Sequence, residues 1–152
     1  MSEALIAPLN CFVVDDTLHD RDLLVTTLKT IGVKHVITAG NGSEAFQALA
    51  AATKPADLVL CDIRMPNGNG LQLLHAIRNG AIKNVRMDAS FILVTAHPTA
   101  EAVKIASSLD AHGFVVKPVL PEKLSAVVLK ARRTTFPVTP GRYAKVSVPG
   151  TF

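Results

Sequence analysis

The chain has 152 residues, of which 49% are hydrophobic, 5% aromatic and 18% charged, and its formal net charge is +4. This length suits a single domain with a sizeable, mainly aliphatic core. No apolar stretch reaches the roughly 18 residues of a membrane helix. The N-terminus has no basic region before its short apolar run, so we expect a cytoplasmic protein without a signal peptide. Cys11 and Cys61 lie in apolar runs and are expected to be buried thiols rather than a disulfide or metal pair.

The excess positive charge lies at the C-terminal end of the chain. Residues 1–130 contain twelve basic and twelve acidic residues, whereas residues 131–152 contain four basic residues and no acidic one. Four dispersed charges are too few to indicate DNA binding. We therefore expect a solvated basic tail with no direct contact to DNA.

Five apolar strand patterns alternate with five helical patterns along the chain. Strands are expected at about 10–15, 33–38, 57–62, 90–95 and 112–117, and helices at about 18–31, 43–53, 70–79, 98–109 and 121–133. Ser43 is the expected N-cap of the second helix, and Pro98 is expected in the first turn of the fourth. This alternation predicts an α/β fold, a doubly wound five-stranded parallel sheet with helices on both faces.

The last segment, 134–152, breaks the alternation. It contains three prolines and two glycines, and residues 143–148 mix β-forming residues with partial alternation. We therefore expect one domain at 9–133 and a basic C-terminal tail or extended arm at 134–152, too short for an output domain.

Polar residues end four of the expected strands. Asp15 and Asp16 close the first strand, Asp62 the third, Thr95 the fourth and Lys117 the fifth. Ligands of open parallel sheets bind beyond the carboxyl ends of the strands, so these groups are expected to converge. Mg²⁺ fits such carboxylates best, because it retains waters and leaves room for a phosphate oxygen. An Asp beside the cation can attack phosphorus, while the amine and the hydroxyl contact the phosphoryl group.

Together these motifs resemble those of bacterial two-component response regulators, in particular the stand-alone, chemotaxis-type (CheY-like) receiver domains. The resemblance covers about residues 9–133 and implies a flavodoxin-like (βα)5 receiver fold. The motifs that carry it are Val13-Val14-Asp15-Asp16, Leu60-Cys61-Asp62-Ile63-Arg64-Met65-Pro66 with Gly68 and Gly70, Leu93-Val94-Thr95-Ala96, and Gly113-Phe114-Val115-Val116-Lys117-Pro118.

The resemblance implies a phosphoacceptor signalling switch rather than an enzyme. Asp62 would accept a phosphoryl group from a sensor histidine kinase or a phosphotransfer protein. Asp16, Asp62 and the backbone carbonyl of Arg64 would bind Mg²⁺, and Asp15 would help through a water molecule. The chain would then signal by protein–protein contact.

Further positions have roles only through this resemblance. Thr95 and Lys117 would sense the phosphoryl group, and Thr95 and Phe114 would form a two-state switch. Arg64 and His97 flank the expected phosphoryl site, and they would tune the lifetime of the phosphate.

Two other functions share part of the pattern. A phosphohydrolase of the haloacid-dehalogenase type also uses a strand-end Asp and Mg²⁺, but it usually has a second Asp two residues after the nucleophile. Here Asp15 is followed by Asp16 and Thr17, and Asp62 by Ile63 and Arg64, so the spacing fails. An interaction module with an inactive site is disfavoured because every phosphorylation residue is present.

A homodimer is also expected. Its interface would be the face made by the segments 98–109, 112–117 and 121–133, with help from the tail. Val146, Val148 and Phe152 are the apolar groups that the tail would bury on a neighbouring protomer. A tail folded back on its own domain is the alternative.

Overall fold

A five-stranded parallel sheet forms the centre of the computed structural model, which describes residues 2–139 and 141–150. The strands follow the spatial order β2-β1-β3-β4-β5. They are β1 (Asn10–Val14), β2 (His35–Ala39), β3 (Leu58–Cys61), β4 (Ser90–Thr95) and β5 (Gly113–Val116). The expected doubly wound sheet is confirmed.

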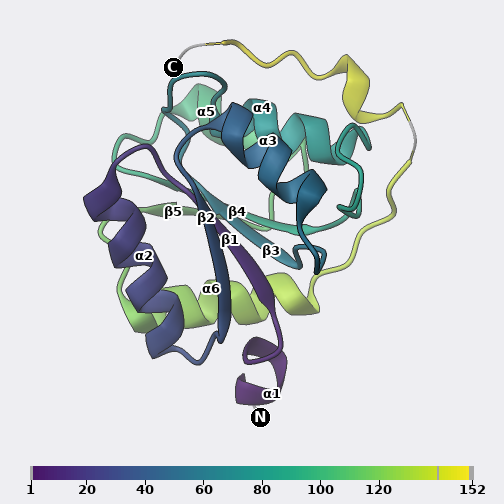
Figure 1. Cartoon of the computed structure of the whole chain (residues 1–152). Helices are drawn as coiled ribbons and strands as arrows, with labels where there is room; N and C mark the ends of the chain where they lie inside the picture. Colours follow the sequence, from purple (N-terminus) through teal and green to yellow (C-terminus); the bar gives the residue numbers. More distant parts are fainter. Residues whose placement is uncertain (1, 140, 151–152) are drawn as a thin grey trace.

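Helices cover both faces of the sheet. They are α1 (Ser2–Ile6), α2 (Leu18–Thr30), α3 (Gly42–Ala51), α4 (Gly70–Arg78), α5 (Ala100–Ser108) and α6 (Pro121–Arg133). Figure 1 shows α2 and α6 on one face and α3, α4 and α5 on the other. Successive side chains of β1 point to opposite faces of the sheet. Phe12 and Val14 pack in the core under α3, α4 and α5, whereas Cys11 and Val13 pack in the core under α2 and α6. No helix in the described part of the chain is long and apolar enough to cross a membrane.

Some local expectations are wrong. Asn41, not Ser43, caps α3, because its side chain accepts a hydrogen bond from the backbone N–H of Glu44. Pro98 lies before α5, which Thr99 caps. The short helix α1 was not predicted, since five residues give too little periodicity to detect.

The described part of the C-terminal tail, residues 134–139 and 141–150, folds back on its own domain. Where an extended arm was expected, residues Tyr143–Lys145 form a 3-10 helix, η1, and the Tyr143 side chain is fully buried. Val146 and Val148 pack against the core under α3, α4 and α5. Burial against the domain therefore overrides the local strand preference of this segment. Phe152 lies outside the described residues.

Candidate functional site

Backbone hydrogen bonds align the carboxyl ends of the central strands. The N–H of Asp62 donates to the carbonyl of Val14 at 2.9 Å, and the N–H of Lys117 donates to the carbonyl of Thr95 at 2.9 Å. Asp62 and Lys117 therefore lie beside the last residue of the neighbouring strand. The parallel register brings together residues that are far apart in sequence, as expected.

Lys117 lies at the centre of a cluster of carboxylates. Its ammonium nitrogen is 2.7 Å from Oδ2 of Asp15, 3.0 Å from Oδ2 of Asp20 and 3.1 Å from Oδ2 of Asp62. Asp15 and Asp62 are buried, whereas Asp16 is exposed. One carboxylate oxygen from each of Asp15, Asp16 and Asp62 lies within 4.8 Å of the others. Three carboxylates at this separation fit a hard divalent cation such as Mg²⁺.

Burial and charge set the protonation of the cluster. Burial raises the pKa of Asp62, and the hydrogen bond and charge of Lys117 oppose this effect. Burial alone would lower the pKa of Lys117, but hydrogen bonds to Asp15, Asp20 and Asp62 outweigh it and raise the pKa above its usual value. Lys117 therefore remains a cation at neutral pH. Its positive charge offsets part of the free energy lost when the carboxylates of Asp15 and Asp62 are removed from water.

The loop after Asp62 is held close to the Asp62 carboxylate. The Asp62 carboxylate accepts a hydrogen bond from the N–H of Ile63 at 2.7 Å, and the carbonyl of Ile63 accepts one from the N–H of Gly70 at 3.0 Å. A Cβ atom at Gly70 would overlap the carbonyl oxygen of Asp62. Glycine is needed here because the start of α4 approaches the backbone of the site.

The remaining predicted residues lie around this cluster. Thr95 is buried, and its hydroxyl oxygen accepts a hydrogen bond from the N–H of His97 at 3.2 Å. Phe114 is partly buried and packs against the core under α3, α4 and α5. The side chains of Arg64 and His97 are exposed. Their effect on phosphate lifetime stays a prediction.

Two contacts at the site were missed from sequence. Asp20 in the first turn of α2 is the third partner of Lys117, and the guanidinium of Arg21 donates to the carbonyl of Asp15 at 2.9 Å. An acidic residue in the first turn of a helix is commonly explained by the helix dipole alone. The place of Asp20 in the sequence could have indicated its role, because α2 starts directly after the strand-end residues Asp15 and Asp16.

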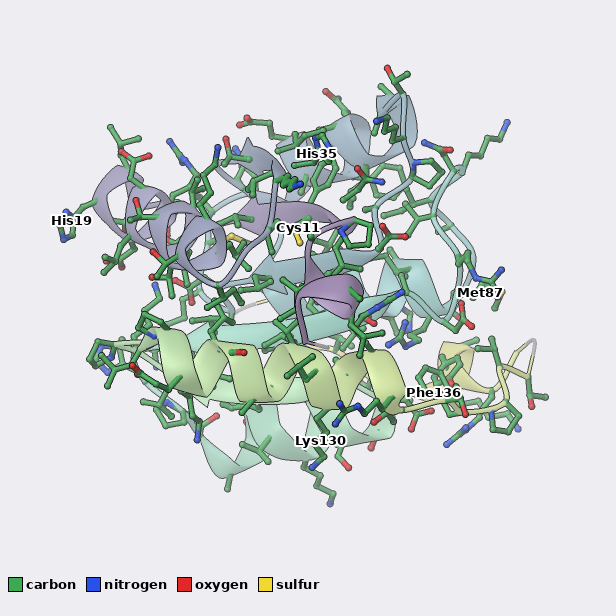
Figure 2. All side chains as sticks on the ribbon, turned by 90° about the horizontal axis from the view of Figure 1, so that it is seen from below. Cys11, His19, His35, Met87, Lys130 and Phe136 are labelled. Carbon is green, nitrogen blue, oxygen red and sulfur yellow. The ribbon has the colours of Figure 1, made fainter. Side chains whose placement is uncertain are left out.

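Replacing Lys117 by Met is expected to lower the free energy of unfolding by about 3 kcal/mol in the absence of divalent cations, because buried Asp15 and Asp62 lose their counter-charge. Urea unfolding would measure the change, and Mg²⁺ should restore part of it. Lys130→Met is the control, since the Lys130 side chain is exposed and extends away from the sheet in Figure 2. Equal stability of the two variants would contradict the prediction.

Comparison with known proteins gives the family of this chain. The Response regulator receiver domain family matches residues 11–129. A probable chemotaxis protein CheY from Rhizobium etli is 31% identical over 120 residues, which cover 79% of this chain and 89% of that protein. The chain belongs to the response regulator receiver family.

Two further similarities concern larger proteins and solved structures. The sensor histidine kinase GacS from Pseudomonas protegens is 32% identical over 117 residues, 77% of this chain but 12% of that protein. The crystal structure of a response regulator receiver protein from Pseudomonas putida is 31% identical, with a TM-score of 0.70, and covers 80% of this chain and 96% of the other.

Membership of the family confirms several predictions. The five-stranded sheet with the order 2-1-3-4-5 is the flavodoxin-like receiver fold. The carboxylates of Asp15, Asp16 and Asp62 form the acidic triad typical of a receiver Mg²⁺ site. Receiver domains are phosphoacceptor signalling domains rather than enzymes, and histidine kinases are their partners.

Proposed function

We propose that this chain acts as a response regulator of the cytoplasm, in which Asp62 accepts a phosphoryl group from a sensor histidine kinase or a phosphotransfer protein. One observation carries the proposal. Asp62, two further carboxylates and the ammonium of Lys117 converge at the carboxyl ends of parallel strands. A nucleophile, a cation site and a phosphate-binding charge are then within reach of a single phosphoryl group.

The residues divide the chemistry between them. A carboxylate oxygen of Asp62 forms a bond to phosphorus while the phosphorus–nitrogen bond of the phosphohistidine breaks, and the imidazole leaves with the electron pair. Asp15, Asp16, Asp62 and the carbonyl of Arg64 would hold Mg²⁺, which supplies positive charge against the repulsion between carboxylate and phosphate. The ammonium group of Lys117 places a further positive charge beside the Asp62 carboxylate.

The surface next to the site supports docking of a partner helix. A hollow of about 260 Å³ lies between α2 and the segment after β5, and its lining includes Leu23, Leu24 and Lys117. Leu18 and Leu23 on α2 are exposed apolar side chains. A helix that carries the phosphohistidine could bury these leucines while presenting its phosphoryl group to Asp62.

The proposal is tested by phosphorylation of the purified chain. Histidine kinases of the source organism, or acetyl phosphate, are added with Mg²⁺, and the label is mapped by mass spectrometry. One phosphoryl group per chain on Asp62 is the expected result. Continuous release of phosphate from a small ester without a labelled chain would favour the phosphohydrolase instead, and no label with any donor would favour an inactive interaction module.

We further propose a coupled switch between Thr95 and Phe114. A phosphoryl group on Asp62 is expected to draw the Thr95 hydroxyl away from the His97 N–H, and Phe114 then turns into the space beside β4. Structures with and without beryllofluoride would reveal the change, and identical rotamers of both residues in the two states would overturn it. Thr95→Val, which keeps the shape but removes the hydroxyl, should leave Phe114 in its resting rotamer.

We also propose a homodimer through the face of α5, β5 and α6. Val103, Val116 and Leu120 on these elements and their loop are exposed apolar side chains, which supports an interface there. The described tail residues contact their own domain. The proposed interface therefore rests on the face of α5, β5 and α6 and not on the tail. A dimer that Val116→Glu dissociates is the expected result in light scattering, with Thr38→Glu on the opposite edge strand as the control; a monomeric wild type would refute the dimer.

A further inference from the structure

The chain continues past the receiver match as a strap, which we define as residues 134–150. Figure 1 shows this yellow segment leaving α6 and passing along the layer of α3, α4 and α5. The family match ends at residue 129. The contacts of the strap therefore belong to this chain and not to the shared fold.

The first part of the strap is anchored at the ends of α4 and α5. The Phe136 ring, which lies beyond the end of α6 in Figure 2, is 5.0 Å from the guanidinium carbon of Arg78 and 5.3 Å from the His112 ring. The Tyr143 hydroxyl donates to the carboxylate of Asp110 at 2.7 Å, and Arg142 pairs with the same carboxylate at 3.2 Å. Because Tyr143 is fully buried, this anchor is part of the core.

The other end of the strap reaches the phosphoacceptor loop. The side-chain amide of Asn69 donates a hydrogen bond to the carbonyl of Pro149 at 2.9 Å. The oxygen of the same amide accepts from the N–H of Gln72 at 2.9 Å, which caps α4. Asn69 is 3% exposed, and both hydrogen bonds are partly buried, which strengthens them relative to bonds in open solvent.

Asn69 is directly connected to the site. Gly70, the next residue, donates its N–H to the carbonyl of Ile63, and the N–H of Ile63 donates to the carboxylate of Asp62. Residues 64–69 form the loop between these points, and this loop includes the Arg64 carbonyl. The strap thus fixes one end of a loop whose other end is the phosphoacceptor.

We propose that the strap, acting through Asn69 as a positioning residue, holds the β3–α4 loop in the geometry that binds Mg²⁺ and phosphate. The inference rests on the proposed function. By linkage, a strap that favours the loaded site must itself be tightened when the site is loaded. Docking of the strap and occupation of the site therefore reinforce each other.

The chain contains its own probe for the strap, because Tyr143 is its one tyrosine and it has no tryptophan. Tyrosine fluorescence of the full chain therefore reports on strap docking alone. Addition of Mg²⁺ and then beryllofluoride should lower the acrylamide quenching of Tyr143. Unchanged quenching, in a protein whose Asp62 is shown to be phosphorylated, would overturn the strap inference and leave the proposed function intact.

Two substitutions test the coupling by calorimetric titration with Mg²⁺, one at Asn69, which the strap contacts, and one at Tyr143 in the strap itself. Asn69→Ser retains a capping oxygen for α4 but loses the donor to Pro149. Tyr143→Phe removes the bond to Asp110 and keeps the ring. Both variants should bind Mg²⁺ more weakly, by about fivefold, the lower range of allosteric coupling. Ser147→Ala, at an exposed strap position, is the matched control and should bind as the wild type does.

The pattern of results decides between a strap effect and a loop effect. Weaker binding in both variants, with an unchanged control and native circular dichroism, supports the inference. Weaker binding in Asn69→Ser alone would confine the effect to the cap of α4 and overturn the role of the strap. Normal binding in both variants would overturn it as well.

Discussion

Replacing Asp62 by Asn is expected to abolish Mg²⁺-dependent phosphorylation by a kinase or by acetyl phosphate. The amide cannot act as the nucleophile, and the neighbouring carboxylates cannot substitute. The Asp15 carboxylate is fully buried and accepts a hydrogen bond from the Lys117 ammonium group, and the Asp16 side chain is exposed. Mass spectrometry of the intact chain measures the result. Asp22→Asn on the exposed surface of α2 is the control and should be labelled fully; full labelling of Asp62→Asn would refute the assignment.

The same substitution is expected to stabilise the fold at neutral pH without Mg²⁺. Burial raises the pKa of Asp62 in the folded state above its unfolded value of about 3.9. The favourable contribution of a group with a raised pKa is present below the unfolded pKa and is lost as pH rises through the folded pKa. The wild type therefore loses stability that Asp62→Asn keeps, and Lys117 retains Asp15 and Asp20 as partners.

Urea unfolding at several pH values measures this difference. The stability advantage of Asp62→Asn should be small near pH 4 and should grow towards pH 7, to about 1 kcal/mol, the usual size for a single substitution. A variant less stable than the wild type at pH 7 would show that the ion pair with Lys117 outweighs the cost of burying the carboxylate.

Replacing Arg78 by Met is expected to lower the free energy of unfolding by about 3 to 5 kcal/mol, the size expected when a buried hydrogen-bond network is broken. The Arg78 side chain is fully buried at the end of α4 and donates to four backbone carbonyls. The acceptors are Leu109 at 2.9 Å, Met87 at 2.7 Å, Ala89 at 3.0 Å and Asp110 at 2.9 Å. Methionine has a similar length but no donor, so it would leave these buried carbonyls without their partner.

Arg78 also stays charged at neutral pH. Burial lowers the pKa of Arg78 to about 10, which still leaves the guanidinium protonated at neutral pH. Arg86→Met is the matched control, because the Arg86 side chain is 82% exposed and its pair with Asp88 is screened by solvent and should contribute little to stability. Comparable losses in the two variants would contradict the assignment of Arg78 as a structural centre.

The sequence alone determined the sheet and most of the site. Buried parallel strands appear in the sequence as short apolar runs, and their carboxyl ends lie at one edge of the sheet. Asp15, Asp62 and Lys117 could therefore be placed together, although Asp15 and Lys117 are 102 positions apart in the sequence. The prediction that helix α6 spans 121–133 matches the structure, because its amphipathic period is long and Pro121 marks its start.

The tertiary structure decided what depends on distant partners. Arg78 reads as an ordinary surface residue at a helix end, and only the approach of four carbonyls from the segments around β4 and α5 makes it a core residue. Asp20 belongs to the site because Lys117, which follows β5, lies next to the first turn of α2 and donates to the Asp20 carboxylate. The β-forming residues 143–148 pair with no strand in the described structure; Tyr143 is buried against Asp110, and Tyr143–Lys145 form a helical turn instead. Local preference is weak, at most about 1 kcal/mol per residue, so contacts between distant segments override it.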